Sequence, residues 1–300
     1  MSGPILVIGS LNMDMVLQVP RVPAAGETLA GQSFACVPGG KGANQAAACA
    51  RLGGQVSMLG RVGADQFGEQ LQRSLAQDGV LHEHVTIADT VSTGVALIMV
   101  DASAQNRIVI VPGANGTLTA AHIDAAADLI DRAALVVLQL EIPLPVVKHA
   151  VARANRRGVP VLLNPAPAKA LPSALLSRLE YLIPNATEAT LLTGIKVADH
   201  AGAAAAAREL HRQGAKHVLI TLGAEGVLIR DAKGVRSLAS PRVAAVDTTA
   251  AGDTFIGAFA VSVLDGLSVD EAAQFAVKAA ALSVTRPGAQ TSIPYRHEIA

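Results

Sequence analysis

The sequence predicts an α/β fold with a doubly wound, mostly parallel central sheet, helices on both faces and a small additional β-sheet. Short β-branched apolar runs alternate with helical patterns over most of the 300 residues, which is typical of right-handed βαβ crossovers. Hydrophobic residues make up 51% of the chain, enough for a large buried core. Two segments, near 11–37 and 93–113, break the alternation. No repeat or linker divides the sequence, so we expect 1–300 to form a single domain.

The strands of the central sheet are expected at short buried runs. The first is ILVIG near the amino terminus, and ALVVLQL, VPVLLN, YLIPN and HVLITLG follow. Helices are expected near 43–52, 120–133, 145–157, 171–179, 187–193 and 201–213, and from Phe255 onward. Because parallel sheets bind ligands at the carboxyl ends of their strands, we expect the site at that edge.

The small sheet is predicted from strand-like alternation. In LNMDMVLQV, Asn12 and Asp14 share one face with Gln18, and the apolar residues share the other. TGVALIMV and NRIVIV read as two further strands joined by the polar turn DASAQN, and 27–37 completes the set. A sheet of this size is too small to be stable alone. We therefore expect a lid with one wet face, which also serves as a dimer contact.

Composition excludes several classes of function. Aromatic residues are 2% of the chain and Trp is absent, which argues against single-stranded nucleic-acid binding. The 24 basic residues equal the 24 acidic ones, so bulk charge does not attract a polyanion. Cys36 and Cys49 have neither metal spacing nor a disulfide framework. No apolar run approaches the roughly 20 residues that span a bilayer. We expect a cytoplasmic protein that binds small molecules.

The stretch TTAAGDTF places a carboxylate where a helix begins. Gly252 and its small neighbours lead into an apolar helical run from Phe255. Such a helix start offers unpaired N–H groups and a positive dipole end, which favours an anion. The residues alone leave two interpretations of Asp253: an N-terminal cap, or a group that takes part in chemistry.

Three further motifs each have a functional and a structural interpretation. PGGKGANQAAA resembles a phosphate-binding loop, but Gly42 follows Lys41 where the P-loop pattern needs Ser or Thr, and tight helix packing is the alternative. In NATE, Asn185 and Glu188 lie toward one crevice, or form a helix cap. The backbone of TLGAEG, 221–226, could face phosphates, or form a tight turn into a hairpin.

Taken in order, the motifs resemble one family. GSLNMD, PGGKGANQA, STGVALI, QLEIPL, LNPAPA, IPNATEATLLTG, ITLGAEGV, VDTTAAGDTFIGA and VTRPGAQTSIP are similar to those of the ribokinase family of carbohydrate and nucleoside kinases, which includes adenosine kinase and fructokinases. The resemblance runs almost end to end and implies ATP-dependent phosphorylation of D-ribose at its 5-hydroxyl. A kinase for deoxyribose, fructose or a nucleoside is the alternative. A sugar-binding regulator without activity is disfavoured because Asp253 is present.

The resemblance also implies roles for individual positions. Sugar contacts would come from Asn12, Asp14, Gly40, Lys41, Gly42, Ala43, Asn44 and Glu141. ATP with Mg²⁺ would lie near Asn185, Glu188, Thr221, Leu222, Gly223, Ala224, Glu225, Gly226, Gly252 and Val277. Asp253 would be the general base, and the amides of Ala250, Ala251, Gly252 and Asp253 would form an anion hole. K⁺ would lie beside Asp247, Thr249, Ser283, Arg286, Gly288 and Ser292, mostly on backbone carbonyls, although Asp247 could instead be a turn residue.

Two positions depart from the family pattern. Val277 stands where relatives often carry His or Asn near the adenine, which puts the nucleotide-base preference in question. Ala250 stands where many members have Gly, a change that is tolerable if the backbone φ angle is negative. From the small sheet we also expect a homodimer formed through the lid sheets.

Overall fold

The central sheet has nine strands, in the order β13-β12-β11-β10-β9-β8-β1-β4-β5. The structure, a computed structural model, describes residues 3–102 and 106–299. Pairing is parallel throughout except for the hairpin edge, where β11, β12 and β13 are antiparallel. The strands are β1 (Ile5–Ile8), β4 (Val56–Gly63), β5 (Leu81–Ala88), β8 (Leu135–Leu138), β9 (Val161–Leu163), β10 (Tyr181–Leu182), β11 (His217–Thr221), β12 (Val227–Asp231) and β13 (Gly234–Leu238).

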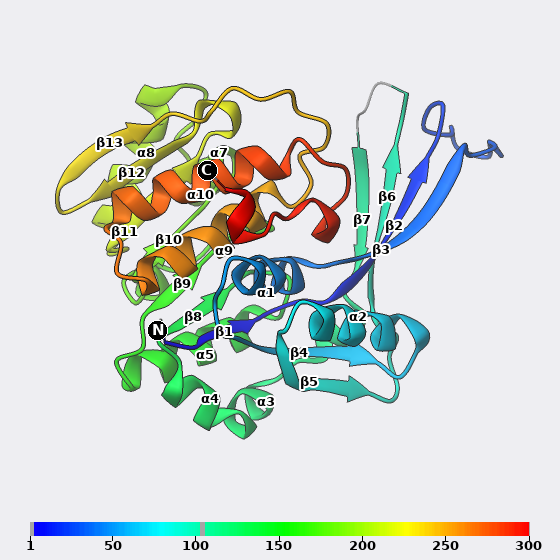
Figure 1. Ribbon diagram of the computed structural model, residues 1–300, viewed down its shortest axis with the longest axis horizontal. Coiled ribbons are helices and arrows are strands. Elements are labelled where there is room, and N and C mark those ends of the chain that lie inside the picture. The colour runs from blue at the N-terminus through cyan, green and yellow to red at the C-terminus, as the bar shows by residue number, and fades with distance from the viewer. Residues whose placement is uncertain (1–2, 103–105, 300) are drawn as a thin grey trace.

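Helices cover both faces of this sheet, which confirms the predicted fold class (Figure 1). In β1, Ile5 and Val7 pack into one apolar core, and Leu6 and Ile8 pack into the other. A strand buried on both faces has to be apolar throughout, as β1 is. The helices are α1 (Lys41–Arg51), α2 (Gln66–Gln77), α3 (Ala120–Ala125), α4 (Ala127–Arg132), α5 (Leu144–Arg156), α6 (Ser173–Leu176), α7 (Ala186–Thr193), α8 (His200–Arg212), α9 (Ala251–Leu264) and α10 (Val269–Ser283).

A separate four-stranded sheet projects from the body, as Figure 1 shows at its right. Its order is β3-β2-β6-β7, with β2 and β6 parallel, and it uses the segments predicted for it. The expectation of a wet face is wrong at the base of the sheet, where Asn12, Met13 and Asp14 are all buried against the body. The strands are β2 (Asn12–Gln18), β3 (Ser33–Gly39), β6 (Gly94–Val100) and β7 (Asn106–Val111).

Several predicted elements differ from the structure. The helix expected over 120–133 is divided at Ala126 into α3 and α4. The helix expected over 171–179 is only α6, because it starts after Pro172, which stands in extended geometry at its N-cap. The pattern did not identify β4, α2, β5 or α10. Part of the expected DASAQN turn, 103–105, lies outside the described residues.

The predicted crevice lies at the carboxyl ends of the central strands. There α1, α7 and α9 begin, and a parallel bridge joins Asn185 to Thr221.

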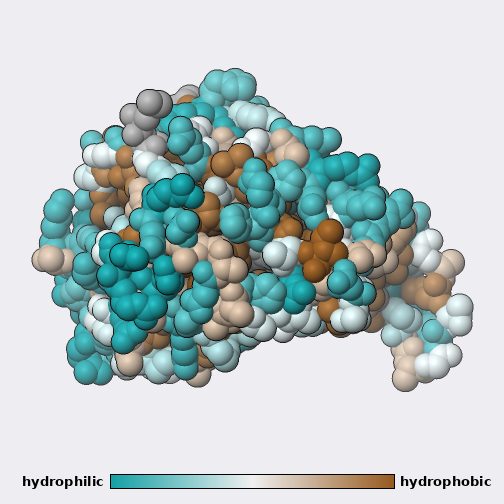
Figure 2. All heavy atoms as spheres, turned by 90° about the horizontal axis from the view of Figure 1, so that it is seen from below, coloured by the Kyte–Doolittle hydropathy of each residue, from teal (hydrophilic) through white to brown (hydrophobic). Residues whose placement is uncertain are grey.

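None of the described helices is long and apolar enough to cross a membrane. On the face of the molecule seen from below, teal hydrophilic atoms interrupt the brown hydrophobic patches (Figure 2).

Candidate active site

Asp253 lies in the first turn of α9 and is only 6% exposed. Its Oδ1 accepts a hydrogen bond from Gln45 Nε2 at 2.9 Å, and its Oδ2 accepts one from Asn44 Nδ2 at 3.0 Å. The N-cap of α9 is Ala250, with no side-chain cap. The capping interpretation of Asp253 is therefore wrong, and its carboxylate is bound to the first turns of α1 instead.

Burial raises the pKa of Asp253, against the opposing influence of the Lys41 ammonium and the amide groups of Asn44 and Gln45. Burial alone would lower the pKa of Lys41, but the carboxylates of Asp253, Glu141, Glu188 and Asp14 outweigh it and leave that pKa raised. The site thus holds a carboxylate of increased basicity beside a firmly protonated lysine. Such a carboxylate is suited to accept a proton during a reaction.

The backbone at the start of α9 carries one unusual residue. Ala250 has φ +58°, which makes it the one non-glycine residue with positive φ in the described ranges. The condition under which Ala was tolerable here, a negative φ, is not met. A side chain in this left-handed region costs roughly 1–2 kcal/mol relative to glycine. The turn is therefore strained at the point where the anion hole is expected.

The amides of this turn are not all available to a ligand. Ala251 N–H donates to Thr248 O at 3.3 Å, so it is partly engaged within the turn. Gly252 and Asp253 N–H donate to no group in the part of the chain that the structure describes. Unpaired amides at a helix N-terminus favour an anion, in keeping with the expected anion hole.

A set of polar groups lies near Asp253: Asn12 and Asp14 at the start of β2, and Asn44, which hydrogen-bonds to Asp253. Asn12 Oδ1 accepts a hydrogen bond from Asn115 Nδ2 at 2.8 Å, which fixes the Asn12 amide. Burial, followed by the charges of Glu141 and Asp253, raises the pKa of Asp14 to about 7. Asn44 Oδ1 is buried without a hydrogen-bond partner among the described residues. These groups form a polar set with unused acceptors, which a polyhydroxylated ligand would satisfy.

Glu141 connects the end of the β8 segment to the glycine motif. Its Oε2 accepts hydrogen bonds from Ser10 Oγ at 2.5 Å and from Lys41 N at 3.0 Å. A Cβ on Gly40, which has φ +87°, would lie 2.6 Å from Asn12 N, and one on Gly42 would lie 2.5 Å from Ser10 N. These glycines therefore support the close-packing interpretation, because the absence of a Cβ atom lets the start of α1 pack against the backbone at the start of β2. That helix begins at Lys41, two residues before the predicted 43–52, and Ala43 is buried in it.

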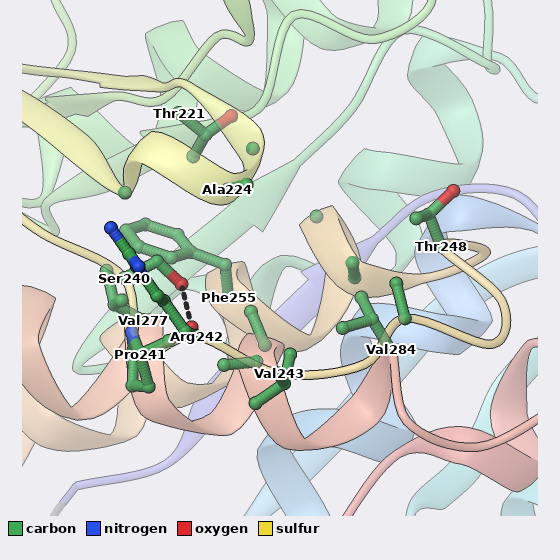
Figure 3. Close-up of a pocket in the computed structure, with 17 residues that line it drawn as sticks. Thr221, Ala224, Ser240, Pro241, Arg242, Val243, Thr248, Phe255, Val277 and Val284 are labelled. Atoms are coloured by element: carbon green, nitrogen blue, oxygen red, sulfur yellow. Dashed lines mark hydrogen bonds between the residues drawn. The ribbon is translucent and has the colours of Figure 1, made fainter.

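A cavity of about 490 Å³ lies between the turn after β11, the loop over 239–249, α9 and α10. Figure 3 shows Phe255 of α9, Val277 of α10 and Val284 just after α10 around it, with Thr221 at the end of β11 and Ala224 in the turn that follows. Its walls are mostly apolar, which suits a flat heterocyclic ring. Of the expected nucleotide set it holds Thr221, Gly223, Ala224, Gly226, Gly252 and Val277. The loop residues Ser240, Pro241, Arg242, Val243 and Ala245 were not anticipated.

A second cavity of about 200 Å³ adjoins the apolar cavity, with which it shares Thr221, Thr248 and Gly252. Lys41, Asn164, Glu188 and Asp253 also line it. Asn185 lines it too, and here the capping interpretation is confirmed. Asn185 Oδ1 accepts from Glu188 N at 2.8 Å, and Glu188 Oε2 accepts from Asn185 N at 2.8 Å. Burial raises the pKa of Glu188. Leu222 and Glu225 lie apart from this cavity, in an adjoining groove with Asn185 and Gly223.

The expected metal sites have few carboxylates. No group of three or more His, Cys, Asp or Glu residues that could hold a metal ion is found in 3–102 and 106–299. Mg²⁺ often binds through one or two carboxylates together with substrate phosphates and water, and Glu188 at the cavity fits that mode.

The segments expected to hold K⁺ are brought together by Asp247. Its Oδ1 accepts from Thr249 N at 2.9 Å and its Oδ2 accepts from Gly288 N at 2.9 Å, so the turn-residue interpretation is correct for its side chain. The remaining side chains are also engaged: Ser283 Oγ donates to Ala280 O, Ser292 Oγ donates to Ala289 O, and Arg286 pairs with Glu298. A K⁺ site here would fit only as a set of backbone carbonyls.

Sequence reasoning missed the residues that hold the functional groups in place: Ser10, Gln45, Asn115, Gln139 and Asn164. Ser10 and Gln45 lie inside quoted motifs, Ser10 two residues before Asn12 and Gln45 directly after Asn44, which was an available signal. Asn115 follows an exposed strand, and nothing local distinguishes it from a turn residue.

Comparisons with known proteins identify the family and several relatives of this chain. The family model described as "pfkB family carbohydrate kinase" matches residues 4–296. A ribokinase from Haemophilus influenzae is 43% identical over 298 residues, covering 99% of this chain and 97% of that protein. A deoxyribokinase from Salmonella typhi is 40% identical over 291 residues, covering 97% of this chain and 95% of that protein. The solved structure of an Arabidopsis thaliana ribokinase complexed with ribose and ATP has TM-score 0.94 and 34% identity, covering 100% of this chain and 98% of that one.

Proposed function

The chain belongs to the pfkB family of carbohydrate kinases, and we propose that it transfers the γ-phosphoryl group of ATP to the 5-hydroxyl of D-ribose. One observation carries the proposal above all. The buried carboxylate of Asp253, at the start of α9, hydrogen-bonds to Asn44 of the polar set that suits a sugar, and the preceding Gly252 lines the apolar cavity that suits a nucleotide base. The Arabidopsis thaliana relative is described as a complex with ribose and ATP.

Asp253 is the proposed general base. The hydroxyl oxygen of ribose attacks the γ-phosphorus, and the new O–P bond forms as the bond to the β–γ bridging oxygen breaks, with that electron pair leaving on ADP. The hydroxyl proton passes to Asp253 as the oxygen becomes nucleophilic, since an alcohol is far too weak an acid to ionise beforehand. The raised pKa of Asp253 improves its ability to accept that proton.

The start of α9 is the proposed anion hole. The three equatorial oxygens of the transferring phosphoryl group carry negative charge, and preorganised amides stabilise it. Gly252 and Asp253 have amides without a partner among the described residues, whereas Ala251 is partly engaged with Thr248. We therefore assign the larger share to Gly252 and Asp253, with the strained turn at Ala250 setting their direction. Lys41, protonated beside the cavity, adds a positive charge.

Ribose is proposed to bind between the base of the small sheet and α1. Asp14 and Glu141 accept hydrogen bonds from sugar hydroxyls, and Asn44 Oδ1, buried without a partner in the described chain, accepts another. Asn12 contributes its amide, held by Asn115.

The small sheet then acts as the lid over this site. Its outer strand β7 is exposed along its whole length, although it is rich in Ile and Val. We propose that this strand is covered in a homodimer formed through the lids.

ATP is proposed to place its base in the apolar cavity near Val277 and its phosphates along the turn 221–226. Mg²⁺ would be held by Glu188 and Asn185 through water, and it would neutralise phosphate charge. K⁺ would bind the carbonyls near Asp247, Thr249 and the 283–292 loop, and it would order the turn that precedes the anion hole.

A coupled assay of ADP release tests the proposal over ribose, deoxyribose, fructose and common nucleosides. Ribose should give the highest kcat/KM. A preference for deoxyribose is the main alternative, because a deoxyribokinase is also a near relative. A preferred nucleoside, or ATP turnover independent of every sugar, would contradict the proposed substrate.

A further inference from the structure

Two fully buried glutamines lie behind Asp253. Gln45, on α1, and Gln139, directly after β8, are each 0% exposed. Gln139 Nε2 donates to Gln45 Oε1 at 2.6 Å. Gln45 Nε2 in turn donates to Asp253 Oδ1 at 2.9 Å and to Asn164 Oδ1 at 3.2 Å. A continuous row of hydrogen bonds thus runs from the middle of the sheet to the carboxylate.

The donor and acceptor directions in this row of hydrogen bonds are determined by Asn164 and Asp253. Asn164 Nδ2 donates to Ile183 O at 2.9 Å, and a backbone carbonyl can only accept. Asn164 must therefore turn its Oδ1 toward Gln45. Gln45 then faces two acceptors, Asn164 Oδ1 and Asp253 Oδ1, and both require its NH₂ group. A reversed Gln45 amide would set its oxygen against both, a costly arrangement in a buried site.

We propose that Gln45, held in one orientation by Gln139 and Asn164, is a positioning residue that aims the carboxylate of Asp253 at the sugar hydroxyl. The proposal rests on the proposed function, because it takes Asp253 as the base. Gln45 holds Oδ1 while Asn44 holds Oδ2, so the carboxylate plane is fixed at two points. Rotation of the carboxylate would break both hydrogen bonds. Asn44 alone would fix only one oxygen.

The charged groups around Asp253 act differently from the amides. The charges of Lys41 and Glu141 shift the pKa of Asp253. The charge of Asp253 in turn shifts the pKa values of Asp14 and Glu188. None of these four hydrogen-bonds to its carboxylate in the described structure, so they set its basicity and leave its direction to Asn44 and Gln45. The packing around the row is equally specific. A Cβ on Gly9 would lie 2.0 Å from Gln139 Oε1, so glycine is needed there for Gln139 to fit.

Gln45→Met tests the role, because methionine keeps the length of the side chain and removes its donor. We expect kcat to fall by about 10–100-fold, as for a small misplacement of a catalytic group, with the KM values of ribose and ATP within about threefold of wild type. Gln45→Glu is the matched control for shape. It faces Asp253 and Asn164 with oxygens, so it should lose at least as much. Wild-type kcat in both variants would overturn the proposal.

A cycle with Asp253→Asn separates positioning from packing. Without the base there is nothing to aim, so Gln45→Met should change the residual kcat by less than about threefold in that background. An equal loss in both backgrounds would overturn the positioning role. If Asp253→Asn alone retained normal turnover, the proposed base itself would be wrong, which is a distinct outcome.

Gln139→Met provides an independent check, since Gln139 hydrogen-bonds to Gln45 and not to Asp253 in the described structure. It should lower kcat by about 3–10-fold and should be less than additive with Gln45→Met. Circular dichroism and melting temperatures identify any variant that fails to fold. If Gln45→Met fails to fold, the Gln139→Met variant decides. An unchanged kcat in Gln139→Met would then overturn the proposed positioning role of Gln45.

Discussion

Asn44 Nδ2 donates a hydrogen bond to Asp253 Oδ2 at 3.0 Å, although the two residues are 209 positions apart in the chain. This contact joins the first turn of α1, in the glycine motif, to the first turn of α9. The start of α1 is therefore linked directly to the carboxylate of Asp253. A change on either helix is expected to reach both binding and chemistry.

Replacing Asp253 by Asn should lower kcat by about 10²–10⁴, the usual contribution of a positioned general base. Asn has nearly the same shape and remains close to Asn44 and Gln45, so ribose binding measured by calorimetry should change little. Initial rates at saturating ATP and ribose provide the measurement. Near-normal turnover in this variant would rule out the base assignment.

Asp14 should make the ribose KM depend on pH near neutrality. Its pKa is raised to about 7, so the carboxylate becomes ionised and accepts sugar hydroxyls only as the pH rises through that value. The KM for ribose should therefore fall between about pH 6 and 8. Asp14→Asn should raise the KM and flatten this profile, with the KM for ATP changing much less. A variant profile that still follows wild type would assign the titration to another group.

Ala250→Gly should stabilise the protein. It relieves a positive φ that costs a residue with a Cβ atom roughly 1–2 kcal/mol. Glycine also makes the unfolded chain more flexible, which offsets about 0.4–1 kcal/mol of this stabilisation. The free energy of unfolding in urea should rise by about 0.5–1 kcal/mol. Ala251→Gly, in the first turn of α9, is the matched control and should lower it. Destabilisation by Ala250→Gly would show that the side chain contributes packing that outweighs the strain.

Asp231 should account for part of the stability lost in acid. Hydrogen bonds from Arg236 lower its pKa to about 2 from 3.8, and its side chain is buried. The unfolded chain binds this proton more readily, so the stabilisation is present above about pH 4 and is lost as the pH falls toward 2, amounting to about 2–3 kcal/mol. Asp231→Asn should lower the free energy of unfolding at pH 7 and remove much of this pH dependence.

The control for Asp231 is an exposed carboxylate. Asp124 pairs with His149 on the surface, where such pairs contribute little, so Asp124→Asn should barely change urea unfolding. If both variants lose the same stability, the cluster at Asp231 has no special role.

K⁺ should activate the enzyme at constant Mg²⁺–ATP. An ion held by the carbonyls near Asp247 would order the turn that carries the anion-hole amides, each of which is worth roughly 2.7–4 kcal/mol when lost outright. KCl added to a tetramethylammonium buffer at constant ionic strength should raise kcat and the melting temperature, and Na⁺ should do so poorly. Asp247→Ala, which releases Gly288 N and Thr249, should weaken both responses. A flat titration would leave the loop with a structural role alone.

Local pattern was sufficient for the fold class and for the family. Buried strands such as ILVI are continuous apolar runs, and apolar residues recur every three to four positions in amphipathic helices. Both patterns can therefore be recognised within a short stretch of sequence. Most of the functional residues lie in short contiguous motifs, and the structure gathers them at one crevice. The elements that pattern did not identify, such as β5 and α10, have burial decided by distant neighbours.

Contacts between distant segments decided the rest. Gln45 and Asp253 are 208 residues apart, and Leu11 and Asn115 are 104 apart, so no local window reveals either hydrogen bond. The sign of φ at Ala250 follows from the closure of its turn onto α9, which an alanine in sequence does not disclose. Residue type and spacing thus determined which chemical groups the chain carries. Three-dimensional packing decided which of them face one another, because hydrogen bonds and burial depend on distance in space.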